Sequence, residues 1–144
     1  MRISRIKDVK LPNRGTEKSA GLDFFVPNDF ETVILHPSDS TKIASGIKVE
    51  VPKGYALIIF NKSGVALKGL QVGACVIDED YQGEINLHVY NYSHHPIRIE
   101  PGQKLVQMIL IPVLYADIEE VYSDELFTEA TSRGEGGFGS TGTH

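Results

Sequence analysis

The chain has 144 residues, 41% of them hydrophobic, which suits one ordinary globular domain and leaves no room for a second. Its 14 basic and 19 acidic residues give a net charge of −5, which argues against nucleic acid or an anionic membrane surface as a partner. Because the chain has a single cysteine and no apolar run near the roughly 18 residues of a membrane span, we expect it in the cytoplasm, or in the host cytoplasm if it is viral.

Short segments between prolines and glycines predict strands along most of the chain, with little space for helices. The stretches 47–51 and 85–90 alternate apolar and polar residues, as strands with one buried face do. YALIIF at 55–60 and LVQMILIPV at 105–113 are apolar on both faces. Such strands fit either a plain sandwich core or a sheet covered by another subunit.

One helical turn and a polar tail complete the predicted elements. SGVALKG at 63–69 could form the turn, with Ser63 as its N-cap. From about Ser123 the pattern fades into a polar, glycine-rich sequence. We therefore predict an all-β core domain over residues 1–122, a sandwich, jelly roll or distorted barrel, followed by a flexible C-terminal arm at 123–144.

The arm contains RGEGGFGSTG at 133–142, whose glycines match the GxGxxG pattern of dinucleotide-binding folds. That pattern needs a strand before it and a helix after it, and only Ser140 to His144 remain for a helix. The segment still offers backbone N–H groups for phosphate oxygens, the cation Arg133 and the aromatic ring of Phe138. These groups suit a nucleotide; the alternative is a glycine-rich terminus without a role.

Five segments resemble, in order, the five short motifs of the dUTPase family, and the third and fifth are the most specific. They are AGLDFFVP at 20–27, NKSGVALKG at 61–69, GACVIDEDYQGE at 73–84, GQKLVQMI at 102–109 and RGEGGFGSTG at 133–142. The resemblance implies a homotrimer of jelly-roll-like, distorted-barrel subunits with Mg²⁺ as cofactor. It implies hydrolysis of dUTP to dUMP and pyrophosphate, which limits uracil incorporation into DNA and supplies dUMP for thymidylate synthesis.

In the third motif, the resemblance implies that Asp78 is the base that activates water for attack on the α-phosphate. Tyr81 would pack under the deoxyribose and exclude the 2′-hydroxyl of UTP. Uracil would be recognised by backbone groups of a hairpin from about 72 to 86. The implied substrate-binding residues of that hairpin are Gly73, Ala74, Cys75, Val76, Ile77 and Asn86. Cys75 departs from the family pattern, which usually has glycine there, and its side chain could strain the turn or crowd the base.

The second and fourth motifs imply the phosphate contacts. Ser63, Gly64 and Gln107 resemble phosphate-contacting residues, and Lys62 stands where the family usually has arginine. A lysine keeps the charge but loses the two-pronged grip of a guanidinium, so Lys62 either binds phosphate less specifically or mainly supports the subunit interface. Asn61 replaces a usual proline.

The remaining implied contacts concern the arm, the metal and assembly. Arg133 would meet the γ-phosphate, Phe138 would stack over uracil, and Gly139 and Ser140 would complete the substrate site. In the family each active site draws on three subunits. Mg²⁺ is held chiefly by the triphosphate and waters, so we expect no direct protein ligand. Asp23 is either an outer partner of the magnesium's waters or of the tail arginine, or simply a turn carboxylate.

Two rival functions remain open at this point. A dCTP deaminase shares the fold and nucleotide type but lacks the fifth motif. A nonenzymatic module that senses nucleotide through its arm would not need the catalytic residues, and the presence of Asp78 and Tyr81 weighs against it.

Overall fold

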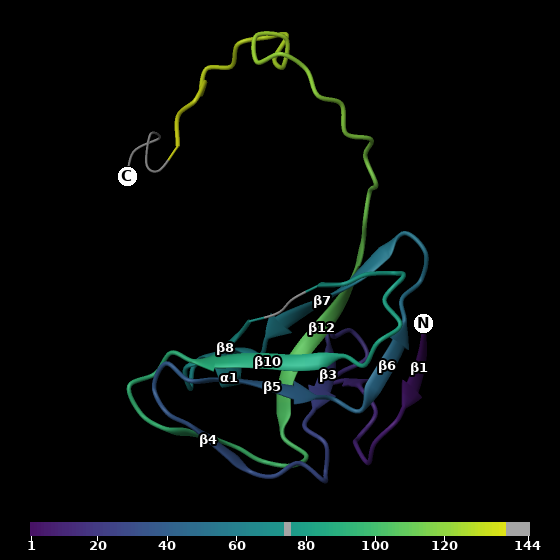
Figure 1. Cartoon of the computed structure of the whole chain (residues 1–144), viewed down its shortest axis with the longest axis vertical. Coiled ribbons are helices and arrows are strands. Elements are labelled where there is room, and N and C mark those ends of the chain that lie inside the picture. The colour runs from purple at the N-terminus through teal and green to yellow at the C-terminus, as the bar shows by residue number, and fades with distance from the viewer. Residues whose placement is uncertain (74–75, 138–144) are drawn as a thin grey trace. The chain divides into compact units, whose positions relative to one another are not determined.

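Antiparallel strands make up nearly all regular structure in a computed structural model of the chain, which describes residues 1–73 and 76–137 (Figure 1). The strands are β1 (Arg2–Arg5), β2 (Asn13–Arg14), β3 (Leu22–Phe25), β4 (Val33–Leu35), β5 (Ser40–Ala44), β6 (Ile47–Glu50), β7 (Tyr55–Asn61), β8 (Leu70–Val72), β9 (Val76–Ile77), β10 (Asn86–Asn91), β11 (Ile97–Ile99) and β12 (Lys104–Pro112). One short helix, α1 (Ser63–Ala66), is found in the described residues. The all-β prediction is confirmed.

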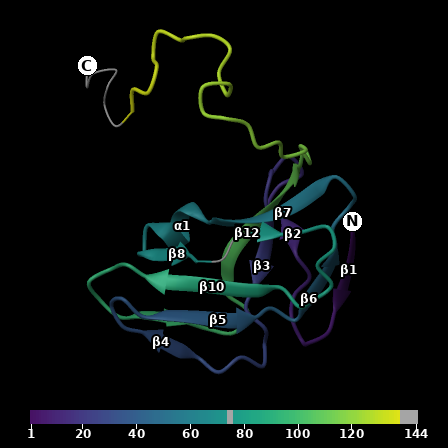
Figure 2. The same cartoon turned by 45° about the horizontal axis from the view of Figure 1, so that its top comes forward.

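Among the described residues the strands form a five-stranded sheet, β2-β3-β12-β7-β9, a three-stranded sheet, β5-β10-β8, and the pairs β1-β6 and β11-β4. Every pairing is antiparallel. Strand β12 lies at the centre of the largest sheet, between β3 and β7. Figures 1 and 2 show these short sheets wrapped around one interior, in the manner of a distorted barrel.

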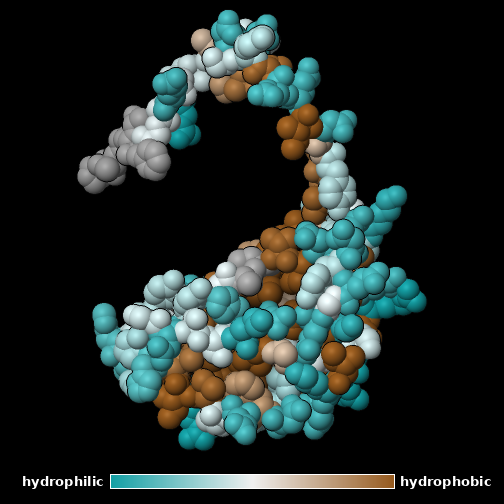
Figure 3. Space-filling view, viewed as in Figure 1, coloured by the Kyte–Doolittle hydropathy of each residue, from teal (hydrophilic) through white to brown (hydrophobic). Residues whose placement is uncertain are grey.

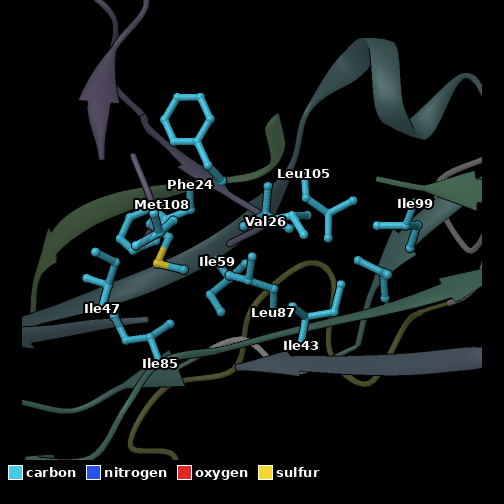
Figure 4. Close-up of a cluster of buried hydrophobic side chains, with 14 of the residues drawn as sticks. Phe24, Val26, Ile43, Ile47, Ile59, Ile85, Leu87, Ile99, Leu105 and Met108 are labelled. Carbon is cyan, nitrogen blue, oxygen red and sulfur yellow. The ribbon is translucent and has the colours of Figure 1, made fainter. Parts of the chain in front are cut away.

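The core follows from the alternation in the sequence, because successive side chains of a strand point to opposite faces. Ile47, Val49 and Val51 are buried while Lys48 and Glu50 are exposed, as predicted. The second alternating stretch is confirmed as well, with Ile85, Leu87 and Val89 buried. Figure 4 shows Ile47, Ile85 and Leu87 meeting side chains from β3, β7 and β12. Burying each such side chain contributes roughly 1.5–3 kcal/mol of transfer free energy.

The two strands that are apolar on both faces, β7 and β12, pair with each other along their length. Ala56, Leu57 and Ile59 of β7 are buried, whereas Tyr55 and Phe60 remain exposed within the single chain. Apolar residues also reach the molecular surface elsewhere, as the brown areas in Figure 3 show. The second face of this sheet is therefore only partly covered by the chain's own residues.

The predicted helical turn exists, but the prediction of Ser63 as its N-cap is wrong. Lys62 is the N-cap, with extended backbone angles and no side-chain cap bond. The carbonyl of Lys62 accepts the N–H groups of Val65 and Ala66, so Ser63 is already the first helical residue. Strand β7 ends at Asn61, immediately before this cap.

The chain divides into two compact units, Met1–Leu114 and Tyr115–His144. The sequence-based boundary lies somewhat later, at 122/123. The second unit contains no helix or strand as far as residue 137, and nearly all of its described residues are exposed. Among the described residues no helix is long and apolar enough to cross a membrane.

Candidate functional site

A cavity of about 230 Å³ opens beside Asp78. Its lining residues come from β7, β9, β10 and the loop between β9 and β10: Ile59, Val76, Ile77, Asp78, Tyr81, Ile85 and Asn86. Five of them were predicted from the sequence, and Ile59 and Ile85 were not. The volume is below the roughly 300 Å³ of a typical drug-sized pocket, so the cavity suits a single ring or sugar.

Asp78 is positioned by strand β9. That strand pairs with β7 through Leu57–Ile77 and Ile58–Val76, and Asp78 is the next residue. Its side chain is exposed and makes no hydrogen bond or ion pair within the described part of the chain. A carboxylate with both oxygens free can hold a water molecule and take its proton.

The acidic sequence Asp78-Glu79-Asp80 lies in the turn that follows β9, outside any strand. Asp78 and Asp80 are exposed, and Glu79 is half-buried. One carboxylate oxygen of Glu79, Oε2, accepts the backbone N–H of Gly54 at 2.5 Å. The three acidic residues therefore have different roles, and Glu79 is the one engaged by the fold.

Tyr81 folds back over its own loop. Its hydroxyl donates a hydrogen bond to the carbonyl of Glu84 at 2.9 Å, and its backbone N–H donates to the carbonyl of Asp78. A Cβ atom on Gly83 would lie 2.3 Å from the tyrosine oxygen. The glycine is thus required for the ring to reach its position in the cavity wall.

A second cluster lies on β3 and its neighbours, around Asp23. Its carboxylate, only 4% exposed as a residue, accepts Lys62 Nζ on Oδ1 and Lys104 Nζ, at 3.0 Å, on Oδ2. Burial raises the pKa of Asp23, but the bonds from Lys62 and Lys104 outweigh burial and hold the pKa below its ordinary value. Two ammonium groups against one carboxylate leave a net positive charge, which suits an anion. Asp23 lies in a strand, so its interpretation as a turn carboxylate is wrong.

Asp23→Asn is expected to lower the free energy of unfolding at pH 7 by about 1.5–3 kcal/mol. The reason is that a neutral amide replaces the carboxylate in its charge-assisted bonds with Lys62 and Lys104. The pKa of Asp23 is lowered in the folded state, so its contribution is fully present above the unfolded pKa of about 3.9 and is lost as pH falls through the folded value. The difference between variant and wild type should therefore shrink below about pH 4. Urea unfolding at pH 7 and pH 3 tests this; a difference independent of pH would contradict it.

Gln107 lies opposite Asp23 in the register of β3 and β12. Its Nε2 donates to the carbonyl of Asn61 at 2.9 Å. The side chain of Asn61 in turn contacts β8, donating to Gln71 Oε1 at 2.6 Å and accepting the N–H of Val72 at 2.8 Å. Asn61 therefore provides hydrogen bonds that a proline could not form, and it fixes the point where β7 enters α1.

The remaining predicted residues fall into four groups. Ser63 and Gly64 are exposed at the start of α1, close in sequence to Lys62, and none of these residues lines the cavity. A Cβ on Gly73 would lie 2.4 Å from the ring of Tyr90, so packing requires this glycine. Arg133 donates to the carbonyl of Gly136 within its own unit. Ala74, Cys75, Phe138, Gly139 and Ser140 lie outside the described residues.

No group of three or more His, Cys, Asp or Glu side chains is arranged to hold a metal within residues 1–73 and 76–137. Asp23, for which an outer partner of the magnesium's waters was one of the alternatives, has one lysine on each oxygen. A divalent cation would have to displace an ammonium group there. The cluster as built therefore fits a phosphate better than a metal ion.

Sequence reasoning missed two polar residues that organise these sites, Lys104 and Glu79. Lys104 opens an apolar strand, three positions before Gln107, and a cation at such a position is the signal that could have revealed it. Glu79 had no distinguishing signal, because its partner is a backbone N–H far away in sequence. Fold and site together define a class of protein, an all-β protein with a small cavity edged by a free carboxylate and with a separate cluster of two lysines on one aspartate that suits an anion.

Comparison with known proteins gives the family. A sequence model described as dUTPase matches residues 7–142. The deoxyuridine 5'-triphosphate nucleotidohydrolase of Anaplasma marginale (strain St. Maries) is 39% identical over 99% of this chain and 96% of that protein. The corresponding protein of Hydrogenobaculum sp. (strain Y04AAS1) is 40% identical over 94% of this chain and 92% of that protein.

The chain is also similar in structure to the Staphylococcus bacteriophage 80alpha dUTPase with dUPNHPP. The TM-score is 0.85 and the identity 26%, covering 98% of this chain and 97% of that chain. The chain belongs to the dUTPase family and is an enzyme of that class, a dUTP diphosphatase. The predicted family and the jelly-roll-like fold are thereby confirmed.

Proposed function

We propose that the chain hydrolyses dUTP to dUMP and pyrophosphate, with Asp78 as the base that activates the attacking water. The observation that carries this proposal is the exposed carboxylate of Asp78 at the edge of a cavity that it shares with Tyr81 and Asn86. In a cell this reaction would limit uracil incorporation into DNA and supply dUMP for thymidylate synthesis. A chain with one cysteine suits the reducing cytoplasm for this work.

In the proposed step, a water oxygen bonds to the α-phosphorus as its proton passes to Asp78. The bond from the α-phosphorus to the oxygen that bridges to the β-phosphorus breaks, and pyrophosphate leaves. Proton transfer to a positioned base contributes on the order of 10²–10⁴ in rate, and alignment of the water adds to it.

Substrate selection is assigned to the cavity wall. The ring of Tyr81, held by its bond to Glu84 and by the close approach of Gly83, would press on the sugar where UTP carries its 2′-hydroxyl. Backbone groups of the segment 73–77 would read the uracil edge. A cavity of about 230 Å³ is small enough for the methyl group of thymine to matter.

Phosphate binding is assigned to the second cluster and the arm. Lys62 and Lys104 retain net positive charge beside Asp23, and Ser63, Gly64 and Gln107 lie close to them in sequence or register. Arg133 would meet the γ-phosphate, and Phe138, with Gly139 and Ser140, would cover the base. Mg²⁺ would enter with the triphosphate, whose charge it neutralises, so the chain itself needs no metal cage.

A homotrimer would bring these separate parts into one site. None of Lys62, Ser63, Gly64 and Gln107 lines the cavity beside Asp78, which is the arrangement expected if different subunits supply them. Apolar side chains that a partner could cover remain exposed, with Leu67 at 90% and Val76 at 60%.

A pyrophosphate-release assay with dUTP, UTP, dCTP and dTTP and Mg²⁺ tests the proposal. We expect turnover of dUTP and a kcat/KM lower by about 10²-fold or more for the three others, because the cavity must exclude an extra hydroxyl, amino or methyl group. Equal turnover of UTP and dUTP would refute the role of Tyr81. Preferential turnover of dCTP would instead refute uracil recognition.

A further inference from the structure

The loop that carries Asp78 and Tyr81, residues 78–85, lies outside any strand. It begins after β9 and ends before β10, and its internal bonds are few. Tyr81 donates to the carbonyls of Asp78 and Glu84, and Asn86 Nδ2 also donates to the Glu84 carbonyl. A loop of this kind needs attachment to the barrel if it is to hold a base in a defined place.

Two glutamates attach the loop, one near each end. Glu79 Oε2 accepts the backbone N–H of Gly54 at 2.5 Å, and Glu84 Oε1 accepts the backbone N–H of Gly46 at 2.7 Å. Gly46 and Gly54 lie on opposite sides of β6 in the sequence, and both have a positive φ, 73° and 78°. Both attachments thus use the same chemistry, a carboxylate on the N–H of a turn glycine.

Both ends have further backbone support, because β9 pairs with β7 immediately before Asp78 and backbone bonds lie on both sides of Glu84. In the described part of the chain, however, only one bond ties the first half of the loop to a neighbouring turn. Beside Glu84, backbone bonds join Ile85 to Ile47 and to Ser45, and Lys7 Nζ lies 3.4 Å from Glu84 Oε1. Beside Asp78, within the described residues, the Glu79 bond is the one link from the loop to the turn at Gly54. That turn is itself anchored, because the Gly54 carbonyl accepts the N–H of Val113 beyond the end of β12.

The loop and β6 also face each other across a hollow in the surface. Glu79 and Tyr81 line a pocket of about 470 Å³ together with residues 48–50 of β6. The two glutamate bonds therefore hold the loop to the turns before and after β6, on either side of the residues that line this hollow.

We propose that Glu79 and Glu84 are positioning residues that clamp the loop to the two ends of β6, Glu79 setting the place of Asp78 and Glu84 that of Tyr81. This inference rests on the proposed roles of Asp78 and Tyr81. Glu79 would govern the chemical step, since a displacement of about 1 Å in a catalytic group can cost about 10²-fold in rate. The backbone carbonyl of Glu84 accepts the hydrogen bond from the Tyr81 hydroxyl. Glu84 would therefore govern the discrimination against UTP.

Steady-state kinetics of the full chain with dUTP and UTP tests the clamp. Glu79→Ala is expected to lower kcat for dUTP about 10- to 100-fold with KM within about threefold, and Glu79→Gln, which keeps an acceptor oxygen, to recover kcat to within about threefold of wild type. Glu84→Ala is expected to lower the ratio of kcat/KM for dUTP over UTP about tenfold. The matched control is Glu50→Ala, which removes an exposed glutamate of β6 that pairs with Arg2 instead of the loop.

Amide hydrogen exchange gives a readout that does not depend on turnover. It distinguishes the loss of one glutamate bond from a general loss of stability in the variant. The Gly54 amide should exchange faster in Glu79→Ala and the Gly46 amide faster in Glu84→Ala, each without acceleration of the other. The clamp would be overturned by unchanged exchange of these amides. It would also be overturned if Glu79→Gln lost as much kcat as Glu79→Ala, or if Glu50→Ala were as impaired in turnover as either loop variant. Absence of dUTP turnover in the wild type, or full activity of Asp78→Asn, would refute the proposed function instead, and the amide exchange would still decide the clamp.

Discussion

Asp78→Asn is expected to lower kcat for dUTP by a factor of about 10²–10⁴ while KM stays within about threefold. The amide has nearly the shape of the carboxylate, but it cannot take a proton from water. The side chain is exposed and makes no bond within the described residues, so the substitution breaks no contact there. Its effect should therefore fall on the chemical step and not on folding.

The measurement is a pyrophosphate assay at saturating dUTP, with the unfolding midpoint as the control for folding. Asp80→Asn, a neighbouring exposed carboxylate in the same turn, provides the comparison of charge removal at an adjacent position. An Asp78→Asn variant with wild-type kcat would show that another group takes the proton. A variant with normal kcat and greatly raised KM would assign Asp78 to binding alone.

Ending the chain at Ser132 is expected to lower kcat/KM for dUTP by about 10²–10³, because the cation at Arg133 and the cover over the base are both removed. The core should not be affected. The described part of this segment makes its bonds locally, with Arg133 donating to Gly136 and Gly134 to Thr131. The unfolding midpoint and the number of subunits in solution should therefore equal those of the full chain.

A chain ending at Gly142 is the matched control, since it keeps the whole of the glycine-rich motif and loses only Thr143 and His144. It should retain full activity. Undiminished activity of the chain that ends at Ser132 would contradict the role proposed for the arm. A change in its number of subunits in solution would instead indicate that the arm contributes to assembly.

Local patterns in the sequence were sufficient for the strands and for much of the core. Alternation along 47–51 gives the buried and exposed residues of β6 correctly, because a strand's side chains alternate regardless of which strand it pairs with. The cap of α1 was mispredicted because Ser63 is a good capping residue by type. What decides the cap is the backbone angle at Lys62, set where β7 ends.

In the candidate site, too, local motifs predicted some residues and only the tertiary structure revealed the others. Motifs in the sequence predicted five of the cavity's seven lining residues, since Val76 to Tyr81 are close together along the chain and Asn86 is nearby. Ile59 comes from β7, and only the pairing of β7 with β9 brings it to the cavity.

The sequence by itself determined the family of this protein, its all-β class and the identity of the residues proposed for the chemistry, because these depend on residue types at short spacings. Only the tertiary structure decided that Asp23 is shared by Lys62 and Lys104, and that Glu79 reaches Gly54. Both contacts join residues far apart in the chain, and one of them ends on a backbone N–H that every residue except proline possesses. Such a contact leaves no signature in residue types, so it becomes visible only when the strands have been paired.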